Sequence, residues 1–154
     1  MIRLLERIYH LEQLLIGFLS LFLGCLIYIA FRQETLILFT WFDISYLSEF
    51  RLITLPFSQI LPNWFLYSLP DGLWVFSYVT ISLVYWKNVI NKRNIFWIII
   101  IPCIGLSSEI GQLFNILPGT FDKSDLLFYF VGTISPFLLF KSDLFNINII
   151  KQWA

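Results

Sequence analysis

Hydrophobic residues dominate four stretches of the chain, and short polar segments separate them. The first stretch, residues 14–31, is almost unbroken and at about 1.5 Å per residue spans most of a bilayer core of about 30 Å. The stretches at 66–86, 95–114 and 126–140 are apolar enough for the same role. The pattern predicts an all-α fold, a bundle of four transmembrane helices in a single integral membrane domain, residues 1–154.

The first stretch also has the outline of a secretory signal. Arg3 and Arg7 precede it, and "FLGC" at residues 22–25 is similar to a lipoprotein cleavage site. However, the small-residue pattern is poor, and the apolar run continues through residues 26–31, where a signal would end. The sequence therefore favours a retained membrane span.

The connection between the first and second spans is too apolar for a solvated loop. Within it, Leu47, Phe50 and Ile53 share one helical face, with polar residues on the opposite face. This pattern predicts an interfacial or re-entrant segment over residues 35–62, which lies on the membrane surface or dips into it. Arg51 is expected to extend its charged group to the water at that surface.

Lysine and arginine are distributed unevenly between the two ends of the predicted bundle. Seven of the ten fall at the end that holds both chain termini, and three fall at the other end. The positive-inside rule then places both termini in the cytoplasm and the segment 35–62 at the outer face. The lipid bilayer is the first expected partner.

The composition agrees with a membrane protein and disfavours other classes. Of the 154 residues, 58% are hydrophobic and only 13% are charged, against about 25% charged in soluble proteins. The formal net charge is zero and the basic residues form no stripe, so no nucleic-acid partner is expected. Cys25 and Cys103 lie inside apolar runs without metal-ligand spacing, so the sequence predicts no metal site and no cofactor.

Polar residues stand beside the most apolar part of the chain, in the stretch "SSEIGQLFNILPGTFDKSD". Glu109 is predicted to lie inside the end of the third span, with Gln112 on the same face. A charge there costs about 2.5–3.5 kcal/mol to insert, so it needs a partner or a wet cavity. Asp71 and Asp125 open the second and fourth spans. The residues expected to line one ligand-binding cleft at the outer face are Asp71, Glu109, Gln112, Asp125 and Tyr129.

Structural roles compete with ligand binding at these carboxylates. Asp71 and Asp125, at helix N-termini, would cap free backbone N–H groups. Glu109 would lie among the lipid headgroups if the third helix ended near Ser107. The sequence predicts no basic residue within the membrane beside the cluster.

The same residues resemble the signature of VanZ-like membrane proteins. In that family a Glu-x-x-Gln pair ends one helix, and a loop leads to an Asp and a Gly on the next helix. Here the pair is Glu109 and Gln112, followed by Asp125 and Gly132, and Asp71 is a weaker match on the preceding helix. The loop arginine of the family is absent, and a tyrosine stands where the family commonly has asparagine.

The resemblance implies a small multi-pass protein of the bacterial cytoplasmic (inner) membrane, linked to the cell envelope. The founding members of the family are tied to teicoplanin resistance, a form of antibiotic resistance. With the polar cleft, this leads to the hypothesis of a VanZ-like protein that binds a lipid headgroup, a lipid-linked glycan or an amphiphilic drug.

Two other functions stay open at this point. The chain is also suited to be an accessory or structural subunit with membrane protein partners, because its aromatic surfaces fit helix packing as well as lipid contact. The third hypothesis is a membrane enzyme acting on a lipid-linked substrate, with Glu109 or Asp125 as general base. No nucleophile or histidine accompanies the carboxylates, so the sequence does not favour an enzyme.

Overall fold

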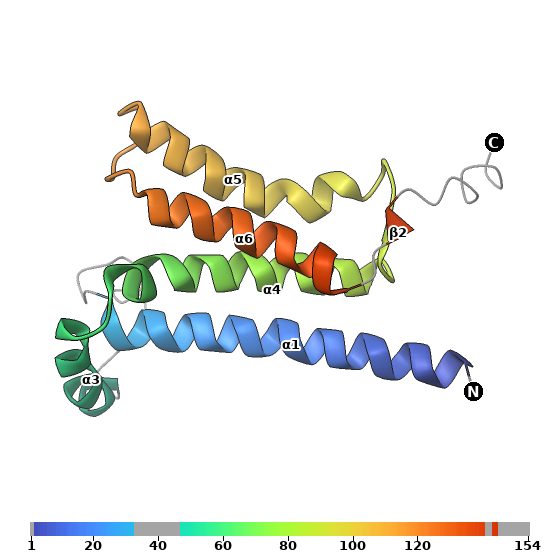
Figure 1. The fold of residues 1–154 in the computed structure, drawn as a ribbon, viewed down its shortest axis with the longest axis horizontal. Coiled ribbons are helices and arrows are strands. Elements are labelled where there is room, and N and C mark those ends of the chain that lie inside the picture. The colour runs from blue at the N-terminus through green and yellow to red at the C-terminus, as the bar shows by residue number, and fades with distance from the viewer. Residues whose placement is uncertain (1, 33–46, 141–142, 145–154) are drawn as a thin grey trace.

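The computed structural model describes residues 2–32, 47–140 and 143–144. The described chain is all-α, as predicted, apart from two strands of two residues each. Its four long helices, each antiparallel to the next along the chain, are α1 (Ile2–Phe31), α4 (Leu69–Tyr85), α5 (Ile95–Leu113) and α6 (Lys123–Leu139) (Figure 1). The shorter elements are α3 (Ser48–Thr54), the 3-10 helix η2 (Leu55–Gln59), the π-helix η3 (Trp64–Ser68), and the parallel strands β1 (Val89–Ile90) and β2 (Asp143–Leu144).

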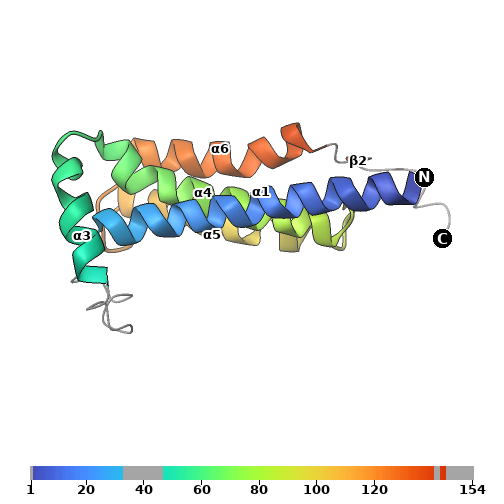
Figure 2. The same cartoon turned by 90° about the horizontal axis from the view of Figure 1, so that it is seen from below.

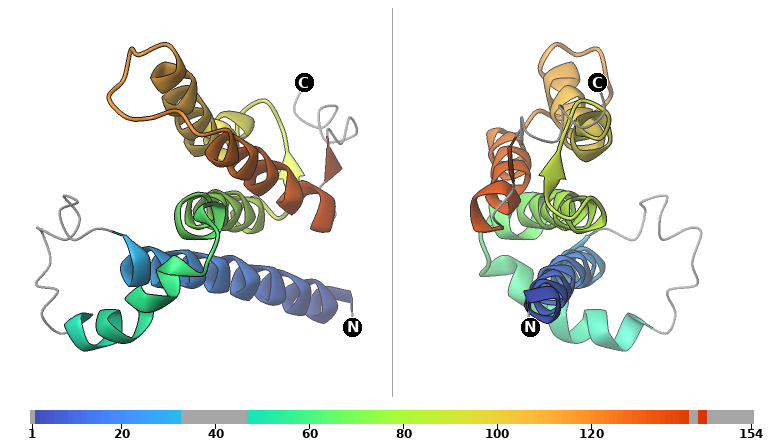
Figure 3. Two further views of the ribbon diagram at one scale, coloured as in Figure 1. Left: turned by 60° about the vertical axis from the view of Figure 1, so that its left-hand side comes forward. Right: turned by 90° about the vertical axis from the view of Figure 1, so that its right-hand side faces the viewer.

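The central helix of the bundle is α4. It contacts α1 on one side and both α5 and α6 on the other (Figures 1 and 3). Its residues Val75, Val79 and Leu83 follow one another at one-turn spacing and are buried, and Ile90 and Ile98 complete this core. The core thus lies between α4 and α5, while α1 packs on the other face of α4.

Large apolar side chains also cover the outward faces of α1, α5 and α6, where a soluble protein would carry polar residues. Phe22 on α1, Phe96 on α5 and Phe130 on α6 are each more than half exposed. Helices that are apolar on both faces are typical of contact with lipid. In the described part of the chain, Arg7–Phe31 and Ile95–Leu113 are long and apolar enough to cross a membrane. These two helices support an association with the membrane.

The helix at the second predicted span, 66–86, begins earlier than Asp71. The π-helix η3 continues directly into α4, and the N–H of Leu69 donates to the carbonyl oxygen of Trp64. Pro70 has no N–H to donate, so the hydrogen-bond pattern changes in the turn before it. The helix therefore starts near Trp64, and Asp71 does not open it.

Two glycines allow α4 and α6 to approach each other closely. A Cβ added at Gly132 of α6 would collide with the carbonyl oxygen of Gly72 of α4. A Cβ added at Gly72 would in turn lie 3.0 Å from both Cβ and the carbonyl oxygen of Phe128. The contact is therefore made by backbone against backbone, which no side-chain rotation can relieve.

The short helix α3 runs across the end of α1 and caps it (Figure 2). Arg51 is only 3% exposed and donates hydrogen bonds to the carbonyl oxygens of Ile29 and of Arg32, the latter at 2.7 Å. The hydroxyl of Thr54 donates to the carbonyl oxygen of Ala30 at 3.2 Å. These donors satisfy carbonyls that a helix C-terminus leaves free. The expectation that Arg51 extends into the interfacial water is therefore wrong.

The predicted interfacial segment 35–62 is described only in part, because residues 33–46 lie outside the described chain. In the described part, Leu52, Ile53 and Ile60 are 72%, 69% and 81% exposed. The apolar face of α3 and η2 thus points away from the bundle. The position of this segment on the membrane surface stays a prediction.

A buried pair of amides joins α1 to the turn after α4. Gln13 and Asn88 exchange two hydrogen bonds of 3.0 Å each and are 1% and 5% exposed. Asn88 has a φ of +60°, a conformation that asparagine tolerates better than most residues. Further along the same face of α1, Gly24 leaves room for the indole of Trp74. The hydrophobic pattern of the sequence gives no sign of this face.

Replacing Gln13→Leu is expected to lower the free energy of unfolding by about 1–3 kcal/mol, because the Asn88 amide would stay buried without partners. Thermal unfolding in detergent, followed by tryptophan fluorescence, measures the loss. The control is Glu12→Gln, on the exposed side of the same turn, which should leave stability unchanged. Equal stability of the two variants would contradict a structural role for the amide pair.

Candidate functional site

The two predicted N-terminal aspartates do not act as helix caps. In α6 the cap is Asp122, whose carboxylate accepts a hydrogen bond of 2.8 Å from the N–H of Ser124. Asp125 is the third residue of that helix, which begins at Lys123. Asp71 likewise lies inside the continuous helix formed by η3 and α4. Neither residue is therefore the N-cap of its helix, although both lie in a first turn, where a carboxylate is favoured by the helix dipole.

Glu109 lies inside α5, since that helix continues to Leu113 and does not end near Ser107. Its side chain is buried, with 5% of its surface exposed. The N–H of Asp122 donates to its carboxylate over 3.4 Å, which ties the end of α5 to the start of α6. The alternative that placed Glu109 among the lipid headgroups through an early helix end is therefore wrong.

Four of the five predicted site residues come together at the end of the bundle where α3 lies. The carboxylates of Asp71, Glu109 and Asp125, from α4, α5 and α6, lie close enough to interact electrostatically. The hydroxyl of Tyr129 lies beside the carboxylate of Asp71 and interacts with it. Gly105 makes room for this tyrosine, because a Cβ there would lie 2.8 Å from the ring. We call these three carboxylates and Tyr129 the acidic cluster.

The fifth predicted residue, Gln112, packs on the loop between α5 and α6. A Cβ added at Gly119 would lie 2.8 Å from the side-chain amide of Gln112. Gly119 has a φ of +134°, which L side chains rarely adopt, so this loop position favours glycine on two grounds. The side chain of Gln112 therefore packs against this loop at Gly119.

Arg32, at the end of α1, is a basic neighbour of the acidic cluster. Its guanidinium attracts the carboxylate of Asp71 electrostatically. Arg32 directly follows the last residue of α1, so the expectation that no basic residue lies within the membrane beside the cluster stays a prediction. The guanidinium carbon lies 5.5 Å and 5.0 Å from the ring centroids of Tyr28 and Tyr67. In the sequence, the signal was an arginine directly after the first apolar run, with Tyr28 one turn before it.

Several buried polar atoms near the cluster have no hydrogen-bond partner within the described chain. They are the hydroxyl of Ser68, the indole nitrogen of Trp74, one carboxylate oxygen of Asp125 and Nε of Arg32. Ser68 is fully buried and lies one turn before Asp71, on the same side of the helix. Buried polar groups in proteins are nearly always paired with protein, water or a ligand. The atoms without a partner at this end include both donors and acceptors, which pair with water or with a polar group of a ligand where either reaches them.

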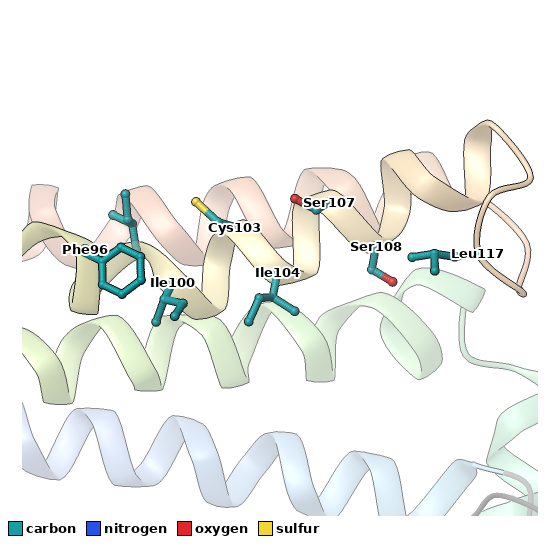
Figure 4. A pocket seen from close by; sticks show the side chains of 8 residues that line it. Phe96, Ile100, Cys103, Ile104, Ser107, Ser108 and Leu117 are labelled. Carbon is teal, nitrogen blue, oxygen red and sulfur yellow. The ribbon is translucent and has the colours of Figure 1, made fainter.

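A separate groove of about 490 Å³ lies on α5 and does not involve the acidic cluster (Figure 4). Ser107 lines this groove, and Glu109 lies two residues further, about 200° around the helix. The groove is therefore on the other face of α5. Its lining is mostly apolar and consists of Phe96, Ile99, Ile100, Cys103, Ile104, Ser107, Ser108 and Leu117.

Comparison with known proteins adds no family to these observations. No family model, no curated protein and no solved structure matches the chain. The VanZ-like resemblance therefore rests on Glu109, Gln112, Asp125 and Gly132 and stays a prediction. Two of its residues have a clear structural place, since Glu109 joins the acidic cluster and Gly132 forms the close contact with α4.

Proposed function

We propose that the protein is a multi-pass membrane protein whose acidic cluster binds the polar or cationic headgroup of an amphiphile. The bound molecule would be a lipid, a lipid-linked glycan or an amphiphilic drug. The observation that carries this proposal is the convergence of three carboxylates from three helices, beside buried polar atoms that have no partner among the described residues. Like charges near one another in an apolar setting are costly, and a polar ligand offsets that cost.

The proposed spans are α1, the helix from Trp64 to Tyr85, α5 and α6. The helix formed by η3 and α4 is about 33 Å long, enough to cross the hydrocarbon core. By the same rise α6 is only about 25 Å long, which leaves Asp125 near the membrane edge. The acidic cluster would then open to one membrane face.

The orientation follows from the basic residues. Lys87, Lys92 and Arg93 lie in or beside the short turn between α4 and α5, at the opposite end of the bundle from the acidic cluster. With the positive-inside rule, this end faces the cytoplasm of a bacterial inner membrane and the acidic cluster faces outward. An outward site fits a role in the cell envelope, and a link to antibiotic resistance is part of the proposal through the VanZ-like resemblance.

Native mass spectrometry of the protein purified in a mild detergent tests this function. We expect a lipid or glycolipid to stay bound to the wild type and to fall at least tenfold in the Glu109→Gln variant, which keeps the shape but removes the charge. The matched control is Glu49→Gln, an exposed glutamate of α3 at the same end of the bundle, which should retain the wild-type amount.

Other outcomes of this experiment favour other functions. If stoichiometric proteins stay bound instead of a lipid, the protein is an accessory subunit and the cluster is an interface. If a divalent cation restores ligand binding or stability that a chelator removes, the carboxylates serve metal-assisted chemistry, as in the enzyme hypothesis. Equal lipid retention in wild type and Glu109→Gln would exclude the cluster as the binding site.

A further inference from the structure

Arg32 is held next to the acidic cluster by aromatic rings and a backbone oxygen. Its Nη2 donates to the carbonyl oxygen of Tyr67 at 3.2 Å, while its guanidinium lies near the rings of Tyr28 and Tyr67. Contacts of this kind are weak at exposed sites and become stronger when water is excluded from them. The side chain is therefore held in place, but by interactions that another cation is able to replace.

The aromatic residues and the acidic cluster share one face of the central helix. Tyr67, Asp71 and Trp74 follow one another at spacings of four and three residues, which places them on the same side of the helix. Across from them, the ring of Tyr28 lies 5.2 Å from that of Trp74. One face of this helix thus offers aromatic rings and a carboxylate together, which is the chemistry that recognises organic cations.

The charges at this site are not balanced within the described chain. The single guanidinium of Arg32 acts on Asp71, which also interacts with the carboxylates of Glu109 and Asp125. The buried oxygen of Asp125 and the fully buried hydroxyl of Ser68 lack hydrogen-bond partners. A positively charged donor would pair with the carboxylate oxygen, and the guanidinium of Arg32 is the cation that the described chain places beside Asp71.

We propose that the ligand of this site carries an organic cation of guanidinium or ammonium type, and that Arg32 occupies the cation position as a tethered competitor. This inference rests on the proposed ligand-binding function of the acidic cluster. Binding then requires Arg32 to leave the tyrosine rings. Since apparent affinity is the intrinsic affinity scaled by the fraction of competent protein, an Arg32 that is in place nine-tenths of the time weakens binding about tenfold.

Ligand-observed fluorine NMR in detergent tests the proposal with 4-(trifluoromethyl)benzylguanidinium. We expect Arg32→Gln to bind this cation at least tenfold more tightly than the wild type, and Asp71→Asn in the same background to abolish the gain. The uncharged analogue 4-(trifluoromethyl)benzylurea should bind all variants equally weakly. Arg93→Gln, an exposed arginine at the opposite end, is the matched control and should behave as the wild type.

The remaining outcomes separate this inference from the proposed function. If Arg32→Gln binds the cation no more tightly, the tethered-competitor role is wrong, while lipid retention that depends on Glu109 still supports the binding site. If neither the cation nor a lipid binds, both proposals fail. Should Arg32→Gln not fold, Arg32→Met serves instead, because methionine keeps an apolar stem against the tyrosine rings but carries no charge. A gain in affinity is expected there too, and its absence overturns the inference.

Discussion

Replacing Gly132→Val is expected to unfold the bundle or to lower its free energy of unfolding by about 3 kcal/mol or more. A side chain at this position meets the backbone carbonyl of Gly72, so α4 and α6 must move apart. Any residue other than glycine or proline also stabilises the helix itself, and alanine in place of glycine does so by about 1 kcal/mol, which opposes the loss of stability. The collision outweighs this gain because the backbone carbonyl oxygen of Gly72 cannot rotate away as a side chain can.

Thermal unfolding and size-exclusion chromatography in detergent measure this effect across Gly132→Ala and Gly132→Val, which should be progressively less stable. The control is Val131→Leu, the neighbouring residue on the exposed face of α6, which should leave the midpoint unchanged. Because α6 carries Asp125 and Tyr129, ligand retention should fall with stability in the glycine variants. A Gly132→Val protein as stable as the wild type would show that α4 and α6 do not pack through their backbones.

Replacing Arg51→Met is expected to lower the free energy of unfolding by about 3 kcal/mol. The guanidinium donates to two carbonyls at the C-terminus of α1, and hydrogen bonds to charged groups contribute about 1.5–3 kcal/mol each. A cation at a helix C-terminus is also favoured by the helix dipole, by up to about 2 kcal/mol in partly buried sites. Methionine keeps an apolar stem but leaves both carbonyls without their donors.

Hydrogen exchange with mass spectrometry should show where the stability is lost. Peptides from the end of α1 and from α3 are expected to exchange faster in Arg51→Met, while peptides from α5 keep the wild-type rate. Arg51→Lys should recover only part of the loss, because one ammonium does not reproduce the planar fork that reaches both carbonyls. If Arg93→Met, at an exposed position, proved as damaging, the effect would not come from capping α1.

The helices were largely predictable, because their signal lies in the chain itself. Apolar runs of span length placed the helices that the structure describes at α1, α4, α5 and α6. The start of α1 at Ile2 was missed, since the first residues include charged side chains that interrupt the apolar run without ending the helix. Charged residues such as arginine and glutamate form helices readily, but they lower the hydropathy of a segment, so a span predicted from hydropathy starts after them.

The partners of polar residues were much harder to predict. The sequence grouped Asp71, Glu109 and Asp125 in space because all three fall at one end of the bundle. This end holds the starts of α4 and α6 and the end of α5. Arg32 was assigned to no partner, although its place after the first span put it at that same end. The sequence predicts a surface position for Arg51. The spacing of residues within α3 gives no sign that this side chain caps another helix.

The amino-acid sequence alone was enough to predict an all-α fold, the positions of the long helices and the end of the bundle at which carboxylates gather. Those properties depend on hydrophobicity and spacing along the chain, which are local. The folded structure was needed to show that α4 is the central helix and that Gly72 touches Gly132. It was also needed to show that Gln13 pairs with Asn88 and that Arg32 lies near two tyrosine rings. These are contacts between residues far apart in the chain, and they depend on how helices rotate and approach, which packing alone sets.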